Sequence, residues 1–229
     1  MVKEKVFTFW EGEMPEYIKL CLETWKFDYV LLNYSNLNDY TNIDIPKIKK
    51  YTLAQISDVV RTHVVRDHGG YWLDTDTIML TEKLPEENMI GIPEHRGIHC
   101  GFLHFEVNAP MLVEWSDKQD EIINSNKTGD WDLFANGCSD PCVKEHIEVS
   151  IKSRDEHFPE LYKFQENTSD NRSKYIKFYF QTNLKPSDIR KTDLLMLHNS
   201  WTPAWYKRLS REEVLKYKCT MSNILKELI

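Results

Sequence analysis

The spacing of hydrophobic and polar residues along the chain predicts helices that alternate with short buried strands. The clearest helix runs from Thr52 to His68, where apolar residues recur at helical spacing until Gly69-Gly70 ends the segment. This alternation favours an α/β fold with a mostly parallel, Rossmann-like sheet flanked by helices. Further helices are expected at Glu16–Trp25, Pro110–Asn124 and Glu212–Leu228, and strands at Val6–Trp10, Tyr29–Leu32, Tyr71–Leu73, Thr77–Leu80, His99–Phe105, Tyr175–Phe180 and Leu194–Leu197.

The length and charge of the chain indicate the number of domains and exclude one class of function. A chain of 229 residues with no visible repeat or boundary suits a single domain over residues 1–229. The net charge of -7 argues against nonspecific nucleic-acid binding, which requires a basic surface. The charged and polar segment from Lys152 to Lys174 is expected to be a mobile loop.

The hydrophobic segments are short, and the cysteines are few. No apolar stretch is long enough to cross a membrane, and the N-terminus lacks a signal-peptide pattern, so we expect a cytoplasmic protein with reduced thiols. Cys138, Cys142 and His146 are spaced by four residues and raise the alternative of a zinc site. Pro141 is expected to interrupt the helix that would align them, and the spacing matches no standard zinc site, so free thiols are favoured.

Two carboxylates stand one residue apart after a predicted strand. Asp74 and Asp76 follow Tyr71–Leu73, and ligands of open α/β sheets gather at the carboxyl ends of strands. Mg²⁺ and Mn²⁺ prefer oxygen ligands and bind through one or two carboxylates together with substrate phosphates. A divalent ion also neutralises the charge that develops on a departing diphosphate. The pair therefore indicates nucleotide-diphosphate chemistry, with ordinary surface carboxylates as the alternative.

A second pair of charged residues lies on the preceding helix. Asp58 and Arg61 are three residues apart, so they share one helix face, and the Gly-Gly turn brings that helix back beside the strand before Asp74. Asp58 can accept hydrogen bonds from a ribose or a base, and Arg61 can reach a phosphate or orient a carboxylate. The alternative is an ordinary surface ion pair that contributes little.

The segment from Ser57 to Asp76 carries a resemblance to a known family. It reads Ser-Asp-x-x-Arg and then Gly-Gly-Tyr-Trp-Leu-Asp-Thr-Asp, which resembles the DXD sugar-binding region of GT-A glycosyltransferases. Proteins with this region include bacterial capsular-polysaccharide glycosyltransferases, fungal-type α-mannosyltransferases and the glucosylating domain of large clostridial toxins. Trp72 stands where the family usually has tyrosine. Phe9–Gly12 resembles the family's first-strand Trp-x-Gly, and Leu197–Trp201 resembles its late Ser-x-Trp region.

The resemblance implies a metal-dependent hexosyltransferase with one GT-A catalytic domain. The donor would be a nucleotide-diphosphate sugar, with a UDP-sugar favoured, and the acceptor a glycan or lipid-linked glycan in polysaccharide synthesis. A lipid-linked acceptor would place the enzyme at the cytoplasmic membrane face. The implied cofactor is Mn²⁺ or Mg²⁺. The implied residues are Asp74, Asp76 and Arg61 for catalysis, Asp74, Asp76 and His198 for the metal, and Trp10, Asp58, Arg61, Trp72, Asp74, Asn199, Ser200 and Trp201 for the donor.

The stereochemistry and the competing functions stay open. The resemblance favours retention of anomeric configuration, whereas inversion would need a carboxylate base such as Glu106, Asp130, Asp132 or Asp140. Haloacid-dehalogenase-type phosphatases share the apolar run before Asp-x-Asp-x-Thr, with Asp74 as nucleophile and Asp76 as acid and base. They also need a later acidic pair, and no clear pair follows a late predicted strand. A non-catalytic protein that binds nucleotide sugars or glycans is the second alternative, and turnover would distinguish it.

Overall fold

The computed structural model describes residues 4–160, 170–189 and 192–229. The chain forms two compact units, each assembled from three separate stretches of sequence. Unit 1 comprises Met1–Gly12, Asp28–Asp74 and Pro85–Ser153, and unit 2 comprises Glu13–Phe27, Thr75–Leu84 and Arg154–Ile229. The sequence showed no such division, and the expectation of a single domain stays a prediction.

Unit 1 contains a six-stranded sheet. Its order is β2 (Val30–Leu32), β1 (Val6–Phe9), β3 (Gly70–Leu73), β6 (Gly97–Phe105), β5 (Met89–Ile92) and β7 (Ile151–Ser153). The pairs β1–β2, β1–β3 and β5–β7 are parallel, whereas β6 runs antiparallel to both β3 and β5. Every strand except β6 therefore points the same way, which confirms the predicted α/β fold with a mostly parallel sheet.

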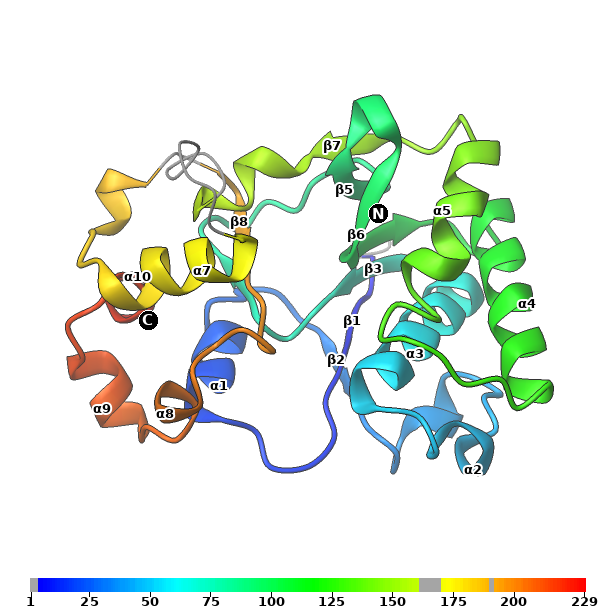
Figure 1. Cartoon of the computed structure of the whole chain (residues 1–229), viewed down its shortest axis with the longest axis horizontal. Coiled ribbons are helices and arrows are strands. Elements are labelled where there is room, and N and C mark those ends of the chain that lie inside the picture. The colour runs from blue at the N-terminus through cyan, green and yellow to red at the C-terminus, as the bar shows by residue number, and fades with distance from the viewer. Residues whose placement is uncertain (1–3, 161–169, 190–191) are drawn as a thin grey trace. The chain divides into compact units, whose positions relative to one another are not determined.

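Among the described residues of unit 1, four helices accompany this sheet, and Figure 1 shows α3 and α4 lying next to each other. The long helix α3 contacts β1, β3 and β6, and α4 packs against α3 and α5. Apolar side chains from the strands and from these helices form one buried core, which includes Phe7, Val60, Trp72, Leu103 and Trp115. The helices are α2 (Ile45–Ile48), α3 (Leu53–His68), α4 (Pro110–Asn124) and α5 (Asn136–Glu145), with 3-10 turns at Leu37–Asp39 and Pro93–His95.

Local signals fix both ends of α3. Thr52 and Gln55 form a reciprocal capping box at its start, which satisfies backbone donors that the first turn leaves unpaired. The helix ends at Gly69, which has a φ of 64°. Gly70 follows with a φ of 88°, and a Cβ atom there would lie 2.3 Å from the carbonyl oxygen of Lys5. These two glycines let the chain reverse directly into β3, beside β1.

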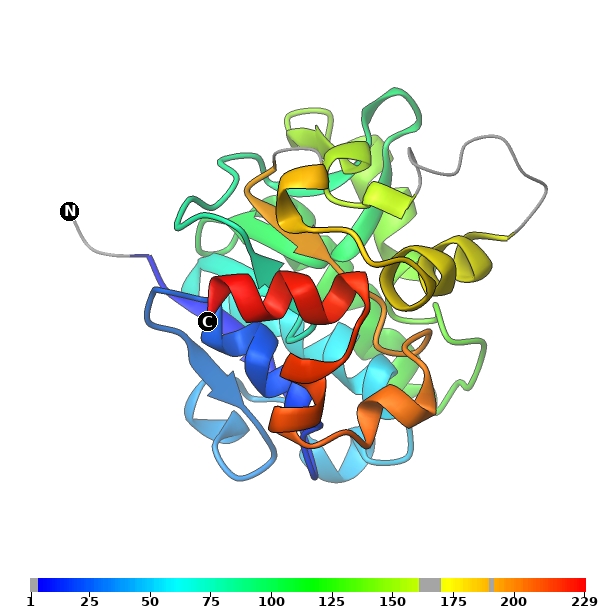
Figure 2. The same cartoon turned by 90° about the vertical axis from the view of Figure 1, so that its left-hand side faces the viewer.

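Unit 2 contains a two-stranded antiparallel sheet and several short helices. In the sheet, β4 (Thr77–Met79) pairs with β8 (Leu194–Met196). Helix α1 contacts β4, α8 and α9, and Figure 2 shows α10 with α9 next to it. The helices are α1 (Glu16–Glu23), α7 (Asn171–Ile176), a π-helical segment at Lys177–Gln181, α8 (Ala204–Lys207), α9 (Arg211–Lys216) and α10 (Thr220–Leu228), with 3-10 turns at Arg154–Glu156 and Pro186–Asp188.

Two predictions about elements in the C-terminal part were wrong, and a third is only partly covered by the described residues. Tyr175–Phe180 is helical rather than extended, because Asp170 caps α7 and the helical turns bury the aromatic rings. The single helix expected at Glu212–Leu228 is two helices, separated where the amide of Thr220 donates to Thr182. The expected loop at Lys152–Lys174 includes part of β7 and the start of α7, and residues 161–169 lie outside the described residues.

Two further expectations concern membrane segments and α5. No helix in the described ranges is long and apolar enough to cross a membrane. Helix α5 runs through Pro141, so the expectation that this proline interrupts the helix was wrong. Proline at this depth removes one helical hydrogen bond, yet Cys138 and Cys142 on the same helix are buried in the core of unit 1. Tertiary packing therefore outweighs the local cost.

Candidate functional site

A buried ion network in unit 1 joins α3 to the end of β3. Arg61 Nη2 lies 3.1 Å from Asp58 Oδ1 and 3.1 Å from Asp74 Oδ1. Asp58 and Arg61 reach each other because they lie one helical turn apart. Asp74 follows β3 directly, and its amide donates to the carbonyl of Gly101 at 2.9 Å. The structure therefore brings together three of the residues that the sequence predicted for the site. We call these three residues, together with Trp72, the Arg61 cluster.

Trp72 packs against Arg61 and Asp74. Its ring is fully buried, its indole N–H donates to Asp74 Oδ1 at 2.8 Å, and the guanidinium of Arg61 lies 5.5 Å from the ring centroid. Trp72 and Asp74 are two residues apart on extended chain, so their side chains project from the same face. In this conformation the Trp72 ring offers no surface on which a donor could stack. Its contacts instead fix the carboxylate of Asp74.

The electrostatics of the cluster are dominated by burial. The pKa of Asp58 is raised to about 7, chiefly by burial; Arg61 lowers this pKa, and the charges of Asp74 and Asp132 raise it. Two carboxylates thus share one cation in a place from which water is largely excluded. The arrangement holds a protonatable acid beside a carboxylate that is only partly buried, since 28% of the Asp74 side chain is exposed.

Trp10 lies at the carboxyl end of β1 in the same unit. Its amide donates to the carbonyl of Leu32 at 3.0 Å, which extends the β1–β2 pairing by one residue. Its indole N–H is buried and has no hydrogen-bond partner among the described residues. Buried donors are rarely left unpaired, so this N–H is a candidate contact for a ligand.

Asp76 belongs to a second group of residues, in unit 2. It is buried, and its Oδ2 accepts a 2.6 Å hydrogen bond from the backbone amide of Asn199. The side chain of Asn199 accepts a 2.5 Å hydrogen bond at Oδ1 from the hydroxyl of Tyr17 in α1. Asp76 and Asn199 were predicted from the sequence, whereas Tyr17 was not.

The turn from His198 to Thr202 carries the remaining predicted donor residues. The amides of Trp201 and Thr202 both donate to the carbonyl of His198. The imidazole of His198 lies between aromatic rings, with centroids 3.9 Å from Trp201 and 5.5 Å from Phe158. Ser200, at the tip of the turn, is exposed. The turn therefore exposes the hydroxyl of Ser200, leaves Asn199 partly exposed and packs its rings together.

A metal centre is not preassembled by the protein alone. Within residues 4–160, 170–189 and 192–229, no group of three or more His, Cys, Asp or Glu side chains could hold a metal ion. A Mg²⁺ or Mn²⁺ site needs only one or two carboxylates when substrate phosphates and water supply the other ligands. Asp76, buried and fixed at one oxygen by Asn199, has the chemistry that such an ion requires.

The other residues considered from the sequence are placed as follows. All five cysteines are buried free thiols, and His146 lies between the carboxylates of Glu114 and Glu148. Of the four candidate bases, Asp132 acts on the pKa of Asp58, and Asp140 accepts a hydrogen bond from Asn136. Glu106 and Asp130 are exposed.

Lys207 in α8 is a cation that the sequence analysis missed. Partial burial lowers its pKa, while the charge of Asp76 acts in the opposite direction. Lys207 is therefore a cation within electrostatic reach of Asp76. Neither periodicity nor a motif distinguishes this lysine from the other lysines of the chain.

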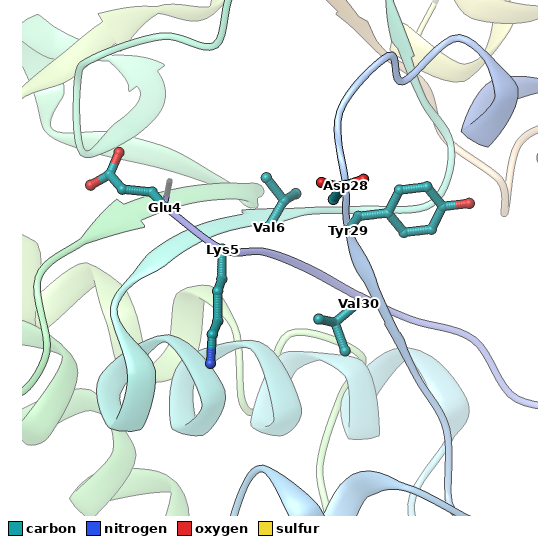
Figure 3. Close-up of a pocket in the computed structure, with 6 residues that line it drawn as sticks. All are labelled: Glu4, Lys5, Val6, Asp28, Tyr29 and Val30. Atoms are coloured by element: carbon teal, nitrogen blue, oxygen red, sulfur yellow. The ribbon is translucent and has the colours of Figure 1, made fainter. Parts of the chain in front are cut away.

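A small hollow lies at the opposite ends of β1 and β2 from Trp10. It has a volume of about 220 Å³ and is lined by Glu4, Lys5, Val6, Asp28, Tyr29 and Val30 (Figure 3). These residues lie at or just before the amino ends of the two strands. Ligands of open α/β sheets bind at the carboxyl ends, so the hollow is separate from the candidate site.

Comparison with known proteins agrees with the resemblance seen in the sequence. Residues 1–99 match the protein family described as "Capsular polysaccharide synthesis protein". The matched range includes Trp10, the Arg61 cluster and Asp76, and the match agrees with the resemblance to bacterial capsular-polysaccharide proteins. The segment Leu197–Trp201 lies beyond it.

The chain is similar to the solved structure "PaToxG Glycosyltransferase", with 13% identity and a TM-score of 0.46 over 64% of this chain and 69% of that one. No curated protein matches the chain.

Proposed function

We propose that this protein is a metal-dependent hexosyltransferase that uses a nucleotide-diphosphate sugar, with a UDP-sugar favoured, in polysaccharide synthesis. The observation that carries the proposal is the Arg61 cluster, in which the Ser-Asp-x-x-Arg helix and the Asp-x-Asp segment form one buried network. It lies within the residues that match capsular polysaccharide synthesis proteins. A surface ion pair would not need this burial or this shared cation.

In the proposed donor site, different side chains contact the base and the ribose of the donor. Trp10 supplies a flat ring and an unpaired N–H for the base. Asp58 and Asp74 accept hydrogen bonds from the ribose, and Arg61 holds the two carboxylates at fixed positions. Trp72 acts through Asp74 rather than on the donor itself. Because Asp58, Arg61 and Asp74 already hold one another, little reorganisation of these side chains is needed when the donor binds.

The diphosphate is assigned to the residues around Asp76. A bound Mn²⁺ or Mg²⁺ would supply Lewis-acid neutralisation of the departing nucleotide diphosphate. Asp76 would hold that ion, with His198 as a further candidate ligand. Asn199 and the exposed hydroxyl of Ser200 are hydrogen-bond donors for phosphate oxygens, and the Trp201 ring packs on His198 to support the turn. These residues orient the leaving group and stabilise its charge, and the acceptor hydroxyl then attacks the anomeric carbon.

The acceptor is proposed to be a glycan or lipid-linked glycan, with the protein acting at the cytoplasmic membrane face in the second case. Two competing functions remain to be tested against this one. A phosphatase would use Asp74 as a free nucleophile, yet Asp74 Oδ1 contacts both Arg61 and Trp72. A binding protein without turnover would keep the same contacts, so only activity separates it.

The test is donor hydrolysis across a panel of UDP- and GDP-sugars, with Mn²⁺ and with EDTA. We expect hydrolysis of one donor that EDTA removes and that Asp76→Ala lowers at least about a hundredfold, because the variant lacks the ligand for the ion. Asp155→Ala, which removes an exposed carboxylate of the same unit, is the control and should act like the wild type. Full activity in Asp76→Ala would contradict the proposal. Nucleotide binding without turnover on any donor or acceptor would favour the binding protein.

A further inference from the structure

Tyr17 occupies an unusual position for a core residue. It is fully buried in α1 and belongs to none of the motifs that the sequence analysis identified. Its hydroxyl nevertheless reaches the turn after β8 and donates to Asn199 Oδ1. The backbone amide of Asn199 in turn donates to Asp76 Oδ2 at 2.6 Å. Two hydrogen bonds thus connect a buried hydroxyl to the carboxylate assigned to the metal.

The bond from Tyr17 also orients the amide of Asn199. With Oδ1 held by the hydroxyl, the amino group of this side chain points away from Tyr17. That amino group makes no hydrogen bond to any residue in the described part of the chain, and Asn199 is partly exposed. A hydrogen-bond donor is therefore available on the same residue whose backbone amide holds Asp76. If the amide were reversed, its carbonyl oxygen would face the same place and would repel an anion.

We propose that Tyr17 is a positioning residue that holds Asp76 through Asn199 and makes Asn199 present its amino group to the diphosphate of the donor. The proposal rests on the proposed function, because it identifies the ligand group as a diphosphate. Tyr17 itself touches neither donor nor metal. It acts by removing the rotational freedom of Asn199 before the ligand arrives, so that binding does not have to restrict that side chain.

The protonation state of Tyr17 suits this role. Burial raises its pKa well above the usual value for tyrosine, and the nearby charge of Asp76 raises it further. Tyr175 and Cys21 act in the same direction, and a hydrogen bond with Thr202 opposes them. The hydroxyl therefore keeps its proton, and remains a donor, across the pH range in which proteins are handled.

Unit 2 supplies a matched control for the tyrosine itself. Tyr206 in α8 is also fully buried, its ring lies 5.8 Å from that of Tyr17, and its hydroxyl bonds to Ser222 Oγ at 3.0 Å. Tyr17→Phe removes the bond to the partly exposed Asn199, and Tyr206→Phe removes the bond to the buried Ser222. The two variants differ in whether the lost bond leads to Asp76, so a purely structural role would affect both alike.

The first measurement uses the nucleotide-free full chain. Amide hydrogen exchange, resolved by residue with NMR, should show faster exchange at Asn199 in Tyr17→Phe, by several-fold to tenfold, and no change there in Tyr206→Phe. The second measurement is calorimetric binding of UDP and of uridine in excess Mg²⁺. Tyr17→Phe should weaken UDP binding roughly fivefold to tenfold and leave uridine binding unchanged, because uridine has no diphosphate.

A second variant tests the orientation of the amide directly. Asn199→Asp keeps an oxygen for Tyr17 but replaces the amino group by an anionic oxygen, so UDP should lose more affinity than in Tyr17→Phe, with uridine again unaffected. Equal behaviour of Tyr17→Phe and Tyr206→Phe, or faster exchange without loss of UDP affinity, would overturn the inference. If the wild type binds no UDP, the proposed donor site fails, whereas the exchange comparison still decides whether Tyr17 holds Asn199.

Discussion

Asp58 is the residue at which the buried site is most sensitive to its surroundings. Its carboxylate is buried on α3, where water cannot stabilise the charge. Asp58 and Asp74 both contact the same nitrogen of Arg61. Burial outweighs the attraction of Arg61, so the pKa of Asp58 rises to about 7. A single side chain therefore makes the stability of unit 1 depend on pH.

The direction of this dependence follows from linkage. In the unfolded chain an aspartate titrates near pH 3.9, so between about pH 4 and pH 7 the folded state binds more protons than the unfolded state. The free energy of unfolding is then highest below about pH 4 and decreases as the pH rises to about 7. Relative to Asp58→Asn, the wild type should lose up to about 1.4 kcal/mol per pH unit across this window. Denaturant unfolding at several pH values measures this difference.

The quantity to compare is how the difference in free energy of unfolding changes with pH. Its absolute size is less useful, because Asp58→Asn also removes a charge partner from Arg61. Asp130→Asn removes an exposed carboxylate of the same unit and should show no such slope. If the difference between wild type and Asp58→Asn stayed constant from pH 4 to pH 8, Asp58 would not be held with a raised pKa.

Which site residues the sequence could predict depends on their separation along the chain. Asp58 and Arg61 are one helical turn apart, and Asp74 follows a short apolar run after two glycines, so spacing alone relates them. Tyr17 and Asn199 are 182 residues apart, and no local pattern connects a helix near one end with a turn near the other. The role of Tyr17 required the folded structure for the same reason.

Among the elements, the strand expected at Tyr175–Phe180 shows how packing overrides local preference. A run of aromatic residues has a high intrinsic tendency to form strands, but that tendency depends on having a sheet to join. In unit 2 the strand β8 pairs with β4. The segment with Tyr175, Phe178 and Tyr179 is helical instead, and it buries these three rings. Asp170, three residues before Ser173, was the local signal for a helix start that the hydrophobic pattern concealed.

The segment between α4 and α5 is a loop that the protein holds firmly. The side chain of Gln55 donates to the carbonyl of Asp130 at 2.9 Å, and Tyr51 donates to that of Lys127. Gln119 donates both to the carbonyl of Asp58 and to that of Phe134. The loop is thereby fastened to α3 at the turn that carries Asp58.

Trp131 lies on this fastened loop, 75% exposed, with a carboxylate on either side in the sequence. An exposed aromatic face with a carboxylate on either side in the sequence suits the stacking of a sugar ring, so we expect Trp131 to bind the acceptor. Trp131→Ala should raise the KM for the acceptor about tenfold and leave donor hydrolysis unchanged, since the lost contact is not made with the donor. Initial rates with varied acceptor measure the effect.

Ile147→Ala is the control, because Ile147 is an equally exposed apolar residue of unit 1 that lies after α5. A Trp131→Ala enzyme with the acceptor KM of the wild type would exclude this loop from acceptor binding. A change in donor hydrolysis would assign Trp131 to the donor site instead.

At the scale of the whole molecule, the chain enters each unit more than once. Asp74 ends one stretch of unit 1, and Thr75 begins a short stretch of unit 2 that contains Asp76 and β4. That short stretch depends on the C-terminal part of the chain, because β4 pairs with β8 and Asp76 is held by Asn199. The family match over residues 1–99 includes Asp76 but not the residues that fix it.

This dependence predicts what a shortened chain can do. A fragment of residues 1–153 keeps the Arg61 cluster and the sequence Asp74-Thr75-Asp76 but lacks β8 and Asn199, so Asp76 loses its partners. Metal-dependent binding of UDP, measured by calorimetry with Mg²⁺ and with EDTA, should be lost in the fragment and recovered in part when residues 154–229 are added. The full-length Asn199→Ala variant gives the contribution of one contact, about tenfold in affinity, and the fragment should lose far more. A fragment that binds UDP as tightly as the full chain, with the same response to EDTA, would show that residues 1–153 form the donor site alone and that residues 154–229 serve another purpose.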